Sequence, residues 1–357
     1  MTAQSGAVRI AWPANRDESQ AIANAFGYIS ASIALAEAFE RNGGIIDDDA
    51  EWELHFVNPM GLRPREGRKT VLFTMYEHAE IPPYFSHGFG RADLVLVPSR
   101  YCRSIFTPLA RAHDVPMDMV PLGFEPSRFP FHPRSWRPGE PFYFLHVGAP
   151  NGRKGIVPVA HAWDAAFRDH PDARLIVKTT TDQTPTVERH GNIVFDSRRY
   201  SAEEMTELYH RAHCLVWPSC GEGFGLPALE AMATGLPIIT VKHSAHPEFL
   251  ERDAFYVPHW MKESPDIFGW KIRGAAADPE DLARAMRRVM GGYQIALAKA
   301  ARGALRAHKS WTWDHAARRL IEVLERRGVG GDSGADAHSG ADNQGRVTDS
   351  GSRQACG

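Results

Sequence analysis

The stretch that decides the fold is residues 220–236, CGEGFGLPALEAMATGL. It follows a short apolar run, CLVWPS at 214–219, and leads into a helical pattern. Small and larger residues alternate at its start: Gly221, Glu222, Gly223, Phe224 and Gly225. Glycines at this spacing favour a backbone that turns tightly and approaches a ligand closely. The helix N-terminus that follows presents free N–H groups and a positive dipole end, so the segment predicts a strand, an anion-binding turn and a helix.

Two glutamates in this stretch have the character of ligand-binding groups. Glu230 lies one turn after Leu226, at the edge of the apolar face of the predicted helix. A carboxylate at such an edge needs a partner, and the two hydroxyls of a diol such as ribose would supply one. The alternative is a purely structural turn in which Glu222 is solvated and Glu230 forms an ion pair. The residues leave both interpretations open, although the strand–loop–helix context favours the ligand site.

Short apolar runs alternate with helical patterns along the rest of the chain. Strands are predicted at residues 8–12, 54–58, 70–77, 94–99, 142–148, 174–180, 192–195, 214–219 and 237–241, with 119–123 as a further candidate. Helices are predicted where apolar residues recur every three or four positions, as at Ile29, Ile33, Ala36 and Phe39. Ser201 with Glu204 forms a capping box, and Asp278 followed by proline marks another helix start. This alternation predicts an α/β protein with mostly parallel sheets.

A proline-rich stretch divides the chain. Residues 126–141, PSRFPFHPRSWRPGEP, have no periodic apolar face and are typical of an interdomain linker. We therefore expect a Rossmann-like domain over 1–128, a linker over 129–141, a second Rossmann-like domain over 142–310, a closing helix over 311–328 and a disordered tail over 329–357. Two such domains predict a ligand site in the cleft between them.

Composition excludes several classes of protein. The 357 residues include 41 basic and 43 acidic side chains, so there is no bulk electrostatic reason to bind nucleic acid. No apolar run approaches the roughly 20 residues of a membrane span, and no signal peptide is visible, so we expect a cytoplasmic protein. The four cysteines form no C-x-x-C pair, and phosphate-loop and dinucleotide motifs are absent. The D-x-D motif of Asp47 and Asp49 is interpreted as an acidic turn.

Residues 220–236 resemble the E-x7-E signature of retaining glycosyltransferases with the GT-B fold, in the large family-4 group also called glycosyl transferases group 1. Glu222 and Glu230 occupy the two glutamate positions. The similarity spans about forty residues around them and continues in four further segments: residues 92–106, 120–129, 144–155 and 310–324. It is weak over the first 60 residues and absent after about 328.

The resemblance implies two facing domains and a nucleotide-diphosphate sugar as donor. In this family the first glutamate, here Glu222, contacts hydroxyls of the donor sugar, and the second, here Glu230, binds the ribose. The backbone of Gly223, Phe224 and Gly225 would meet the donor. No metal or cofactor is expected. The acceptor would be a hydroxyl of a glycan, a lipid or a small molecule, and a peripheral position at the membrane stays open.

Cations for the diphosphate are supplied by the segment HVGAPNGRKG. Lys154 matches a lysine of the family, whereas the family's arginine after the strand glycine is replaced here by Ala149. Arg153 is a candidate substitute for that arginine. Fixed cations of this kind would stabilise the charge that develops on the leaving group. The alternative is a solvated turn, which is how most Arg-Lys pairs behave.

The first domain contributes further candidates. Glu77 and His78 follow a predicted strand, where α/β sheets hold ligands, and His78 is the candidate for the histidine that family members carry near the donor sugar. Gly27 best matches the family's glycine-rich loop, although Phe26 stands where its first glycine usually is.

The second domain adds candidates outside the E-x7-E segment. Arg198 lies near the position at which the family seats the base, and Lys178 ends a predicted strand, either facing the cleft or in solvent. Pro247 and Glu248 match the family's Gly-Gly-x-Pro-Glu run, but its glycines are missing here.

The resulting hypothesis is a retaining glycosyltransferase with catalytic candidates Glu222, Lys154, Arg153 and His78. One alternative is a catalytically silent nucleotide-sugar-binding protein, suggested by Ala149 and Phe26. Another is a GT-B hydrolase or epimerase of nucleotide sugars. The sequence does not identify the donor base, the sugar or the acceptor.

Overall fold

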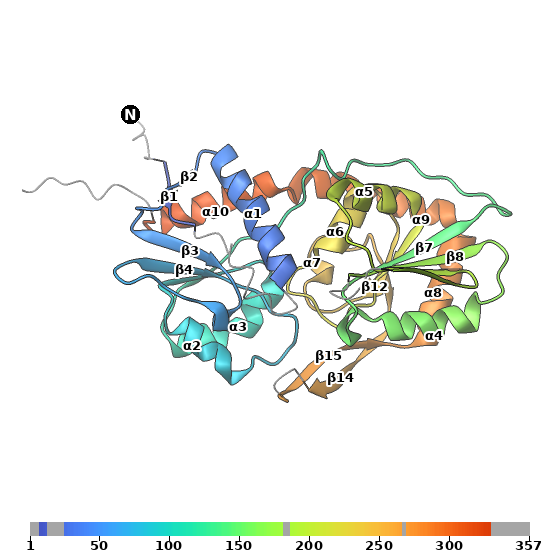
Figure 1. Cartoon of the computed structure of the whole chain (residues 1–357), viewed down its shortest axis with the longest axis horizontal. Coiled ribbons are helices and arrows are strands. Elements are labelled where there is room, and N and C mark those ends of the chain that lie inside the picture. Colours follow the sequence, from blue (N-terminus) through green and yellow to red (C-terminus); the bar gives the residue numbers. More distant parts are fainter. Residues whose placement is uncertain (1–6, 13–24, 181–185, 266–268, 330–357) are drawn as a thin grey trace, which may run out of the picture.

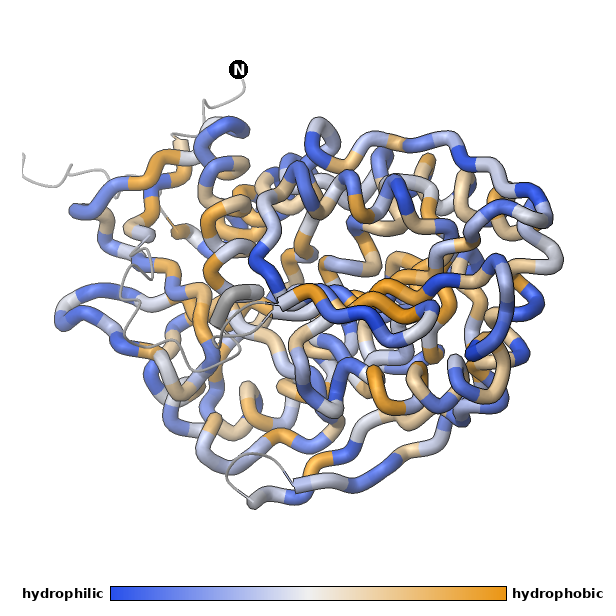
Figure 2. Tube along the Cα trace, turned by 45° about the vertical axis from the view of Figure 1, so that its right-hand side comes forward, coloured by the Kyte–Doolittle hydropathy of each residue, from blue (hydrophilic) through white to orange (hydrophobic). Residues whose placement is uncertain are grey.

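Two parallel sheets, one in each half of the chain, organise the molecule (Figure 1). The computed structural model describes residues 7–12, 25–180, 186–265 and 269–329. Figure 2 shows hydrophobic segments running through the strands and hydrophilic residues concentrated in the outer loops and helix faces. The predicted α/β architecture of two Rossmann-like domains is confirmed.

The first half is built on a four-stranded parallel sheet in the order β3-β4-β5-β6. Its strands are β3 (Trp52–Phe56), β4 (Lys69–Phe73), β5 (Leu94–Val97) and β6 (Met117–Met119). The short parallel pair β1 (Arg9–Ile10) and β2 (Ile45–Ile46) joins it through a bridge between Ala11 and Glu53. The helices of this half are α1 (Ala25–Arg41), α2 (Ser86–Phe89) and α3 (Arg100–Ala112).

The second half is built on a seven-stranded sheet in the order β13-β12-β11-β7-β8-β10-β9, in which only β9 runs antiparallel to its neighbour. Its strands are β7 (Phe142–Val147), β8 (Ala173–Lys178), β9 (Val187–His190), β10 (Ile193–Asp196), β11 (Cys214–Val216), β12 (Ile238–Val241) and β13 (Phe255–Val257). The helices are α4 (Ile156–Ala166), α5 (Ala202–Arg211), α6 (Leu226–Ala233), α7 (His246–Leu250), α8 (Pro279–Gly291) and α9 (Tyr293–Ser310).

Strand order reverses in the second sheet between β7 and β11. From β7 the chain proceeds to β8 on one side, and it later returns through α5 to place β11 on the other side. Loops that leave two such neighbouring strands diverge, and the crevice between them is where α/β sheets bind ligands. The loops after β7 and β11 are those that carry Lys154 and Glu222.

An antiparallel hairpin, β14 (His259–Pro265) and β15 (Lys271–Ala277), lies outside both sheets, at the lower edge of Figure 1. It contacts both halves. The backbone N–H of Ala79 donates to the carbonyl of Arg273, whose guanidinium pairs with Glu80 in the first half. The N–H of Ala275 donates to the carbonyl of Cys220 in the second half.

The last helix, α10 (Trp313–Arg326), returns to the first half and packs against α1. Arg41 fixes this contact through an ion pair of 2.7 Å with Asp314. The two crossings between the halves run side by side, joined by a bridge between Phe124 and Thr312. Gly123 is required there, because a Cβ would lie 2.3 Å from the backbone of Thr312.

Local sequence signals account for most helix starts. Both hydrogen bonds of the predicted capping box are present: the Ser201 hydroxyl accepts from the N–H of Glu204, whose carboxylate accepts from the N–H of Ser201. Asp278 caps α8 as predicted. Asp47 and Asp49 lie in a turn, where Asp47 accepts the N–H of Asp49, so their interpretation as an acidic turn is confirmed.

Several predicted details differ from the structure. The expected stripe of α1 is only partly its core face: Phe39 is fully buried, but Ile33 is 53% exposed. The core face also includes Leu35, which is fully buried. The candidate strand at 119–123 ends at Met119. The predicted tail begins one residue too early, because Val329 is buried in the core, and the rest of it lies outside the described residues. Helices α3 and α9 and the hairpin were not predicted. None of the helices within the described ranges is long and apolar enough to cross a membrane.

Candidate active site

Two loops of the second half meet at the switch point and form an ion cluster. The Nζ of Lys154 lies 2.6 Å from Oε1 of Glu222, and the Ser219 hydroxyl donates to the same oxygen at 2.6 Å. Arg153 completes the cluster, with Nη1 at 3.1 Å from Oε2 of Glu222. Gly148 makes room for the lysine stem, since a Cβ there would lie 2.8 Å from Cγ of Lys154. The structure thus brings together three of the four predicted catalytic residues.

Charge controls the protonation of Glu222. Only 6% of this residue is exposed, and burial by itself would raise its pKa. The positive charges of Lys154 and then Arg153 more than offset burial and hold the pKa of Glu222 well below its ordinary value. Glu222 is therefore a permanent carboxylate at neutral pH, suited to accept hydrogen bonds from hydroxyl groups and unsuited to donate a proton.

The first half reaches this cluster through the loop after β4. The carboxylate of Glu77 lies 3.4 Å from Nη2 of Arg153, so one guanidinium links Glu77 and Glu222 across the domain boundary. His78 follows immediately. Burial lowers the pKa of His78, with Glu77 opposing the shift, and its Nδ1 is buried without a hydrogen-bond partner. His78 is therefore a neutral imidazole beside the cluster, in the region where the sequence placed it.

The glycines of the loop make the contact between the halves possible. A Cβ on Gly221 would lie 2.0 Å from the carbonyl oxygen of Glu77, and one on Gly223 would lie 2.7 Å from Cβ of Met75. Gly225 has φ +110° and lies against the Trp217 ring. The sequence analysis predicts that these glycines let the backbone approach a ligand, whereas in the structure their Cα atoms face other parts of the protein.

Phe224, between two of these glycines, is a core residue. It is 2% exposed and stacks on Phe249 at 5.5 Å between ring centroids. Its side chain therefore anchors the loop.

The loop before α7 supports Glu222 from the other side. Ser244 has φ +53°, a left-handed conformation that is strained for a residue with a Cβ, at a position where the family has glycine. Its hydroxyl accepts the backbone N–H of Glu222 at 2.9 Å. Glu248 in α7 accepts the N–H groups of Arg100 and Tyr101, both at 2.9 Å, and so caps α3 of the first half.

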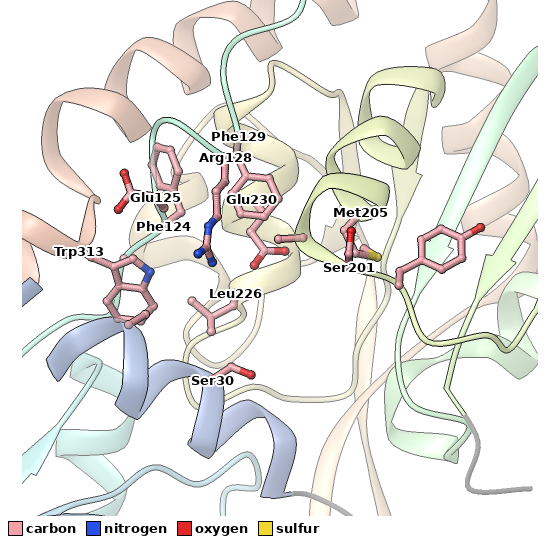
Figure 3. A pocket seen from close by; sticks show the side chains of 14 residues that line it. Ser30, Phe124, Glu125, Arg128, Phe129, Ser201, Met205, Leu226, Glu230 and Trp313 are labelled. Carbon is pink, nitrogen blue, oxygen red and sulfur yellow. The ribbon is translucent and has the colours of Figure 1, made fainter. Parts of the chain in front are cut away.

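Glu230 lines a cavity of about 240 Å³ between the halves (Figure 3). The lining comes from α1, the crossing segment, α5, α6 and α10: Ser30, Ala34, Gly123, Phe124, Glu125, Arg128, Phe129, Tyr200, Ser201, Ala202, Met205, Leu226, Glu230 and Trp313. The Tyr209 hydroxyl donates to Oε2 of Glu230 at 2.9 Å. Burial raises the pKa of Glu230 to about 7, and the Tyr209 hydrogen bond opposes the shift. The two glutamates of the signature thus have opposite protonation behaviour.

Other predicted site residues lie beside the cavity or apart from it. Arg198 is held by the Asp196 carboxylate, 2.6 Å from its Nη2, and also contacts the Tyr200 hydroxyl. Lys178 is buried, donates to the carbonyls of Thr179 and Arg198 and lies over the Tyr200 ring, so the solvent alternative is excluded. Gly27 lies in the first turn of α1 and not in a glycine-rich loop, and the open space around its Cβ position means that no close approach requires a glycine there.

Comparisons with known proteins agree with this geometry. Residues 141–291 match the family model described as Glycosyl transferases group 1. The chain is 31% identical over 167 residues to the MMP alpha-(1->4)-mannosyltransferase of Mycolicibacterium hassiacum, covering 45% of this chain and 39% of that protein. It is 44% identical over 125 residues to the O-antigen chain mannosyltransferase RfbU of Salmonella typhimurium, covering 32% and 34%. The aligned stretch is thus less than half the length of these curated relatives.

Solved structures match over most of the chain. A sucrose-phosphate synthase from Thermosynechococcus elongatus superposes with a TM-score of 0.59 at 18% identity, covering 83% of this chain and 77% of that one. Anabaena HepE in complex with UDP-glucose superposes with a TM-score of 0.57 at 12% identity, covering 82% of both chains. These superpositions show that the chain has the GT-B fold. The match to the glycosyl transferases group 1 model covers residues 141–291, which is less than half of the chain.

Sequence reasoning missed the residues that support the two glutamates. Ser219 and Ser244 bond Glu222, and Tyr209 bonds Glu230. No sequence pattern pairs Tyr209 with a residue 21 positions later. Ser244 carried one signal, since it stands at a position where the family has glycine.

Proposed function

We propose that this protein transfers a sugar from a nucleoside-diphosphate donor to an acceptor hydroxyl, with retention at the anomeric carbon. One observation carries the proposal. The Lys154–Glu222 pair lies at the switch point of the second sheet, and Glu230 lines a cavity eight residues further along the same segment, one turn into α6. The cation Lys154 matches the diphosphate of such a donor, the permanent carboxylate Glu222 matches its sugar, and the second carboxylate, Glu230, matches its ribose.

The donor would lie along α6. Glu230 accepts the ribose hydroxyls, and the diphosphate lies at the helix N-terminus near Leu226, where the positive end of the helix dipole favours an anion. Four residues of helix separate these points, a rise of roughly 6 Å, which suits the distance from a ribose to a diphosphate. The sugar then reaches Glu222, whose ionised carboxylate accepts its hydroxyls.

Charge stabilisation would come from the chain's own cations. Negative charge develops on the diphosphate as the glycosidic bond breaks, and Lys154 stabilises it by exchanging part of its contact with Glu222 for a phosphate oxygen. We assign Arg153 a positioning role, because its guanidinium already holds Glu77 and Glu222 together. We propose that no metal or cofactor takes part, which a chelator titration of activity would test.

Retention follows in this proposal from proton transfer on the leaving-group side. A diphosphate oxygen takes the proton of the incoming hydroxyl, and the acceptor attacks from the same face. Glu77 and His78, from the first half, border that face and orient the acceptor or the sugar. Because His78 is neutral, it can both donate and accept a hydrogen bond.

The test begins with binding and continues with turnover. Thermal shift with ADP, GDP, UDP, CDP and TDP identifies the base, since a ligand at 100 times its dissociation constant adds about 2.7 kcal/mol of stability. Turnover of the matching sugar nucleotides is then measured from the amount of nucleoside diphosphate released. The anomeric configuration of the product sugar is determined by NMR. Binding without any release in the presence of candidate acceptors would favour a silent binder, and an inverted anomer would contradict retention. Release of free sugar as the only sugar product would favour a hydrolase. Formation of an isomerised sugar nucleotide would favour an epimerase.

A further inference from the structure

The cavity beside Glu230 contains a second charged group that the proposed donor site does not use. Arg128, from the segment that crosses between the halves, lines this cavity, and Figure 3 shows its guanidinium pointing toward the space beside Glu230 and Leu226. Arg128 is an exposed residue, and within the part of the chain that the structure describes its guanidinium makes no hydrogen bond and no ion pair. Its positive charge acts on the carboxylate of Glu203 in α5 from beyond ion-pair distance. Three charged side chains line the cavity, so their partners decide what a ligand meets.

The carboxylates of the cavity leave Arg128 without a partner. Glu125 is held by Arg41, whose Nη2 lies 3.4 Å away, and by the hydroxyl of Ser127 at 3.2 Å. Glu230 uses one oxygen, Oε2, to accept from Tyr209. Its other oxygen is not among the buried, unpartnered atoms of the described residues, so it is open to the cavity. One donor group and one acceptor group therefore face the same space without pairing.

The same packing positions the backbone of Arg128 and the carboxylate of Glu230. The carbonyl of Arg128 accepts the Thr206 hydroxyl of α5 at 2.7 Å, and its N–H donates to the carbonyl of Glu125. The next residue, Phe129, is buried against the Tyr209 ring, with 6.0 Å between ring centroids. Tyr209 in turn holds Glu230, so Arg128 and Glu230 are positioned through a shared contact.

The chemistry of the two groups selects a vicinal diol. Each hydroxyl of a diol can donate to the free carboxylate oxygen and accept from the guanidinium, which satisfies both groups at once. A phosphate at this point would face the Glu230 carboxylate, and a purely apolar group would leave both charges unpaired.

We propose that Arg128 forms the second half of the ribose site, donating to the hydroxyl oxygens whose protons Glu230 accepts. This inference rests on the proposed nucleotide donor and adds to it a residue from the crossing segment. Ribose would thereby be held from both sides, by α6 of the second half and by the segment that leads out of the first.

Deoxyribose analogues supply the test. Once the preferred base is known, calorimetry compares the ribonucleoside diphosphate with its 2′-deoxy and 3′-deoxy forms on wild type, Arg128→Ala and Arg128→Lys. Arg137→Ala, on the same proline-rich stretch but outside the cavity lining, is the matched control. We expect wild type and the control to prefer the ribonucleotide over at least one deoxy form by about 10-fold or more, the size of a charge-assisted hydrogen bond. Arg128→Ala should bind the ribonucleotide and its two deoxy forms with affinities within about 3-fold of one another. The preference of Arg128→Lys should lie between those of wild type and Arg128→Ala, because lysine lacks the planar guanidinium fork.

The outcomes separate the possible errors. If wild type binds no nucleoside diphosphate, the proposed function fails, and with it this inference. If Arg128→Ala weakens the ribo and deoxy forms equally, the arginine acts only through its charge on the diphosphate, and the ribose assignment is wrong. An unchanged preference in Arg128→Ala likewise overturns it. Circular dichroism and melting temperature show whether each variant is folded before binding is interpreted.

Discussion

Donor affinity should depend on pH through Glu230. In the ligand-free protein, burial raises the pKa of this carboxyl to about 7, and the opposing hydrogen bond from Tyr209 is the only one that the carboxylate accepts from the described residues. The ribose hydroxyls need an ionised acceptor, so donor binding selects the carboxylate. Affinity should therefore rise with pH and level off above the pKa.

The magnitude follows from the ionised fraction. A carboxyl with a pKa of 7 is about 3% ionised at pH 5.5 and about 90% ionised at pH 8, so the dissociation constant should fall about 30-fold between these values. The assay is calorimetry with the intact sugar nucleotide, whose two phosphates are both esterified and do not titrate in this range. Glu230→Gln removes the titrating group and serves as the control. A flat profile in wild type, or the same slope in Glu230→Gln, would refute the reasoning.

Stability should change with pH in the opposite direction. The pKa of Glu230 is higher in the folded protein than its ordinary value of 4.5, so the fold favours the protonated form. That contribution is fully present below pH 4.5 and is lost as the pH rises through about 7. Without ligand, the melting temperature of Glu230→Gln should therefore gain on that of wild type between pH 5 and pH 8. A difference that stays constant over this range would show that Glu230 does not titrate as described.

Three further perturbations test other parts of the site. Lys154→Ala should lower single-turnover rates about 100-fold or more while nucleoside affinity changes little, and near wild-type turnover would remove Lys154 from the chemistry. Gly221→Ala should lower the melting temperature and the activity together, because the new Cβ would lie 2.0 Å from the Glu77 carbonyl oxygen. Gly27→Ala is the control and should be neutral, because nothing lies within 4 Å of its Cβ position. Equal effects of the two substitutions would contradict the packing argument. Tyr209→Phe should shift the pH midpoint of donor binding upward, because Glu230 loses the hydrogen bond that lowers its pKa, and an unmoved midpoint would show that this bond is not made in solution.

Local signals were enough for the α/β class and for most elements of the second half. Strands such as β7 and β12 are continuous apolar runs that a sheet covered on both faces requires. The capping box of Ser201 and the N-cap of Asp278 are local in sequence, so they could be read directly. The E-x7-E spacing placed both glutamates on one strand–loop–helix unit, because the geometry of such a unit is itself local.

The N-terminal helix shows where local reasoning stops. The predicted stripe through Ile33 and Phe39 is apolar and has helical spacing, yet the buried face of α1 contains Phe39 and Leu35 and leaves Ile33 exposed. The reason is that α1 is covered on one side by α10, which comes from the other end of the chain. No pattern within α1 indicates which of its apolar residues that helix covers.

The sequence alone determined which residues are chemically able to serve a donor, since residue type and spacing fix charge, hydrogen-bonding capacity and position on a strand or helix. Tertiary structure decided how they behave. It paired Glu222 with Lys154 and Arg153 and left Glu230 with one tyrosine, so one carboxyl has a lowered pKa and the other a raised one. Protonation depends on which charges lie within a few ångströms and on how much water is excluded, and both depend on contacts between segments far apart in the chain.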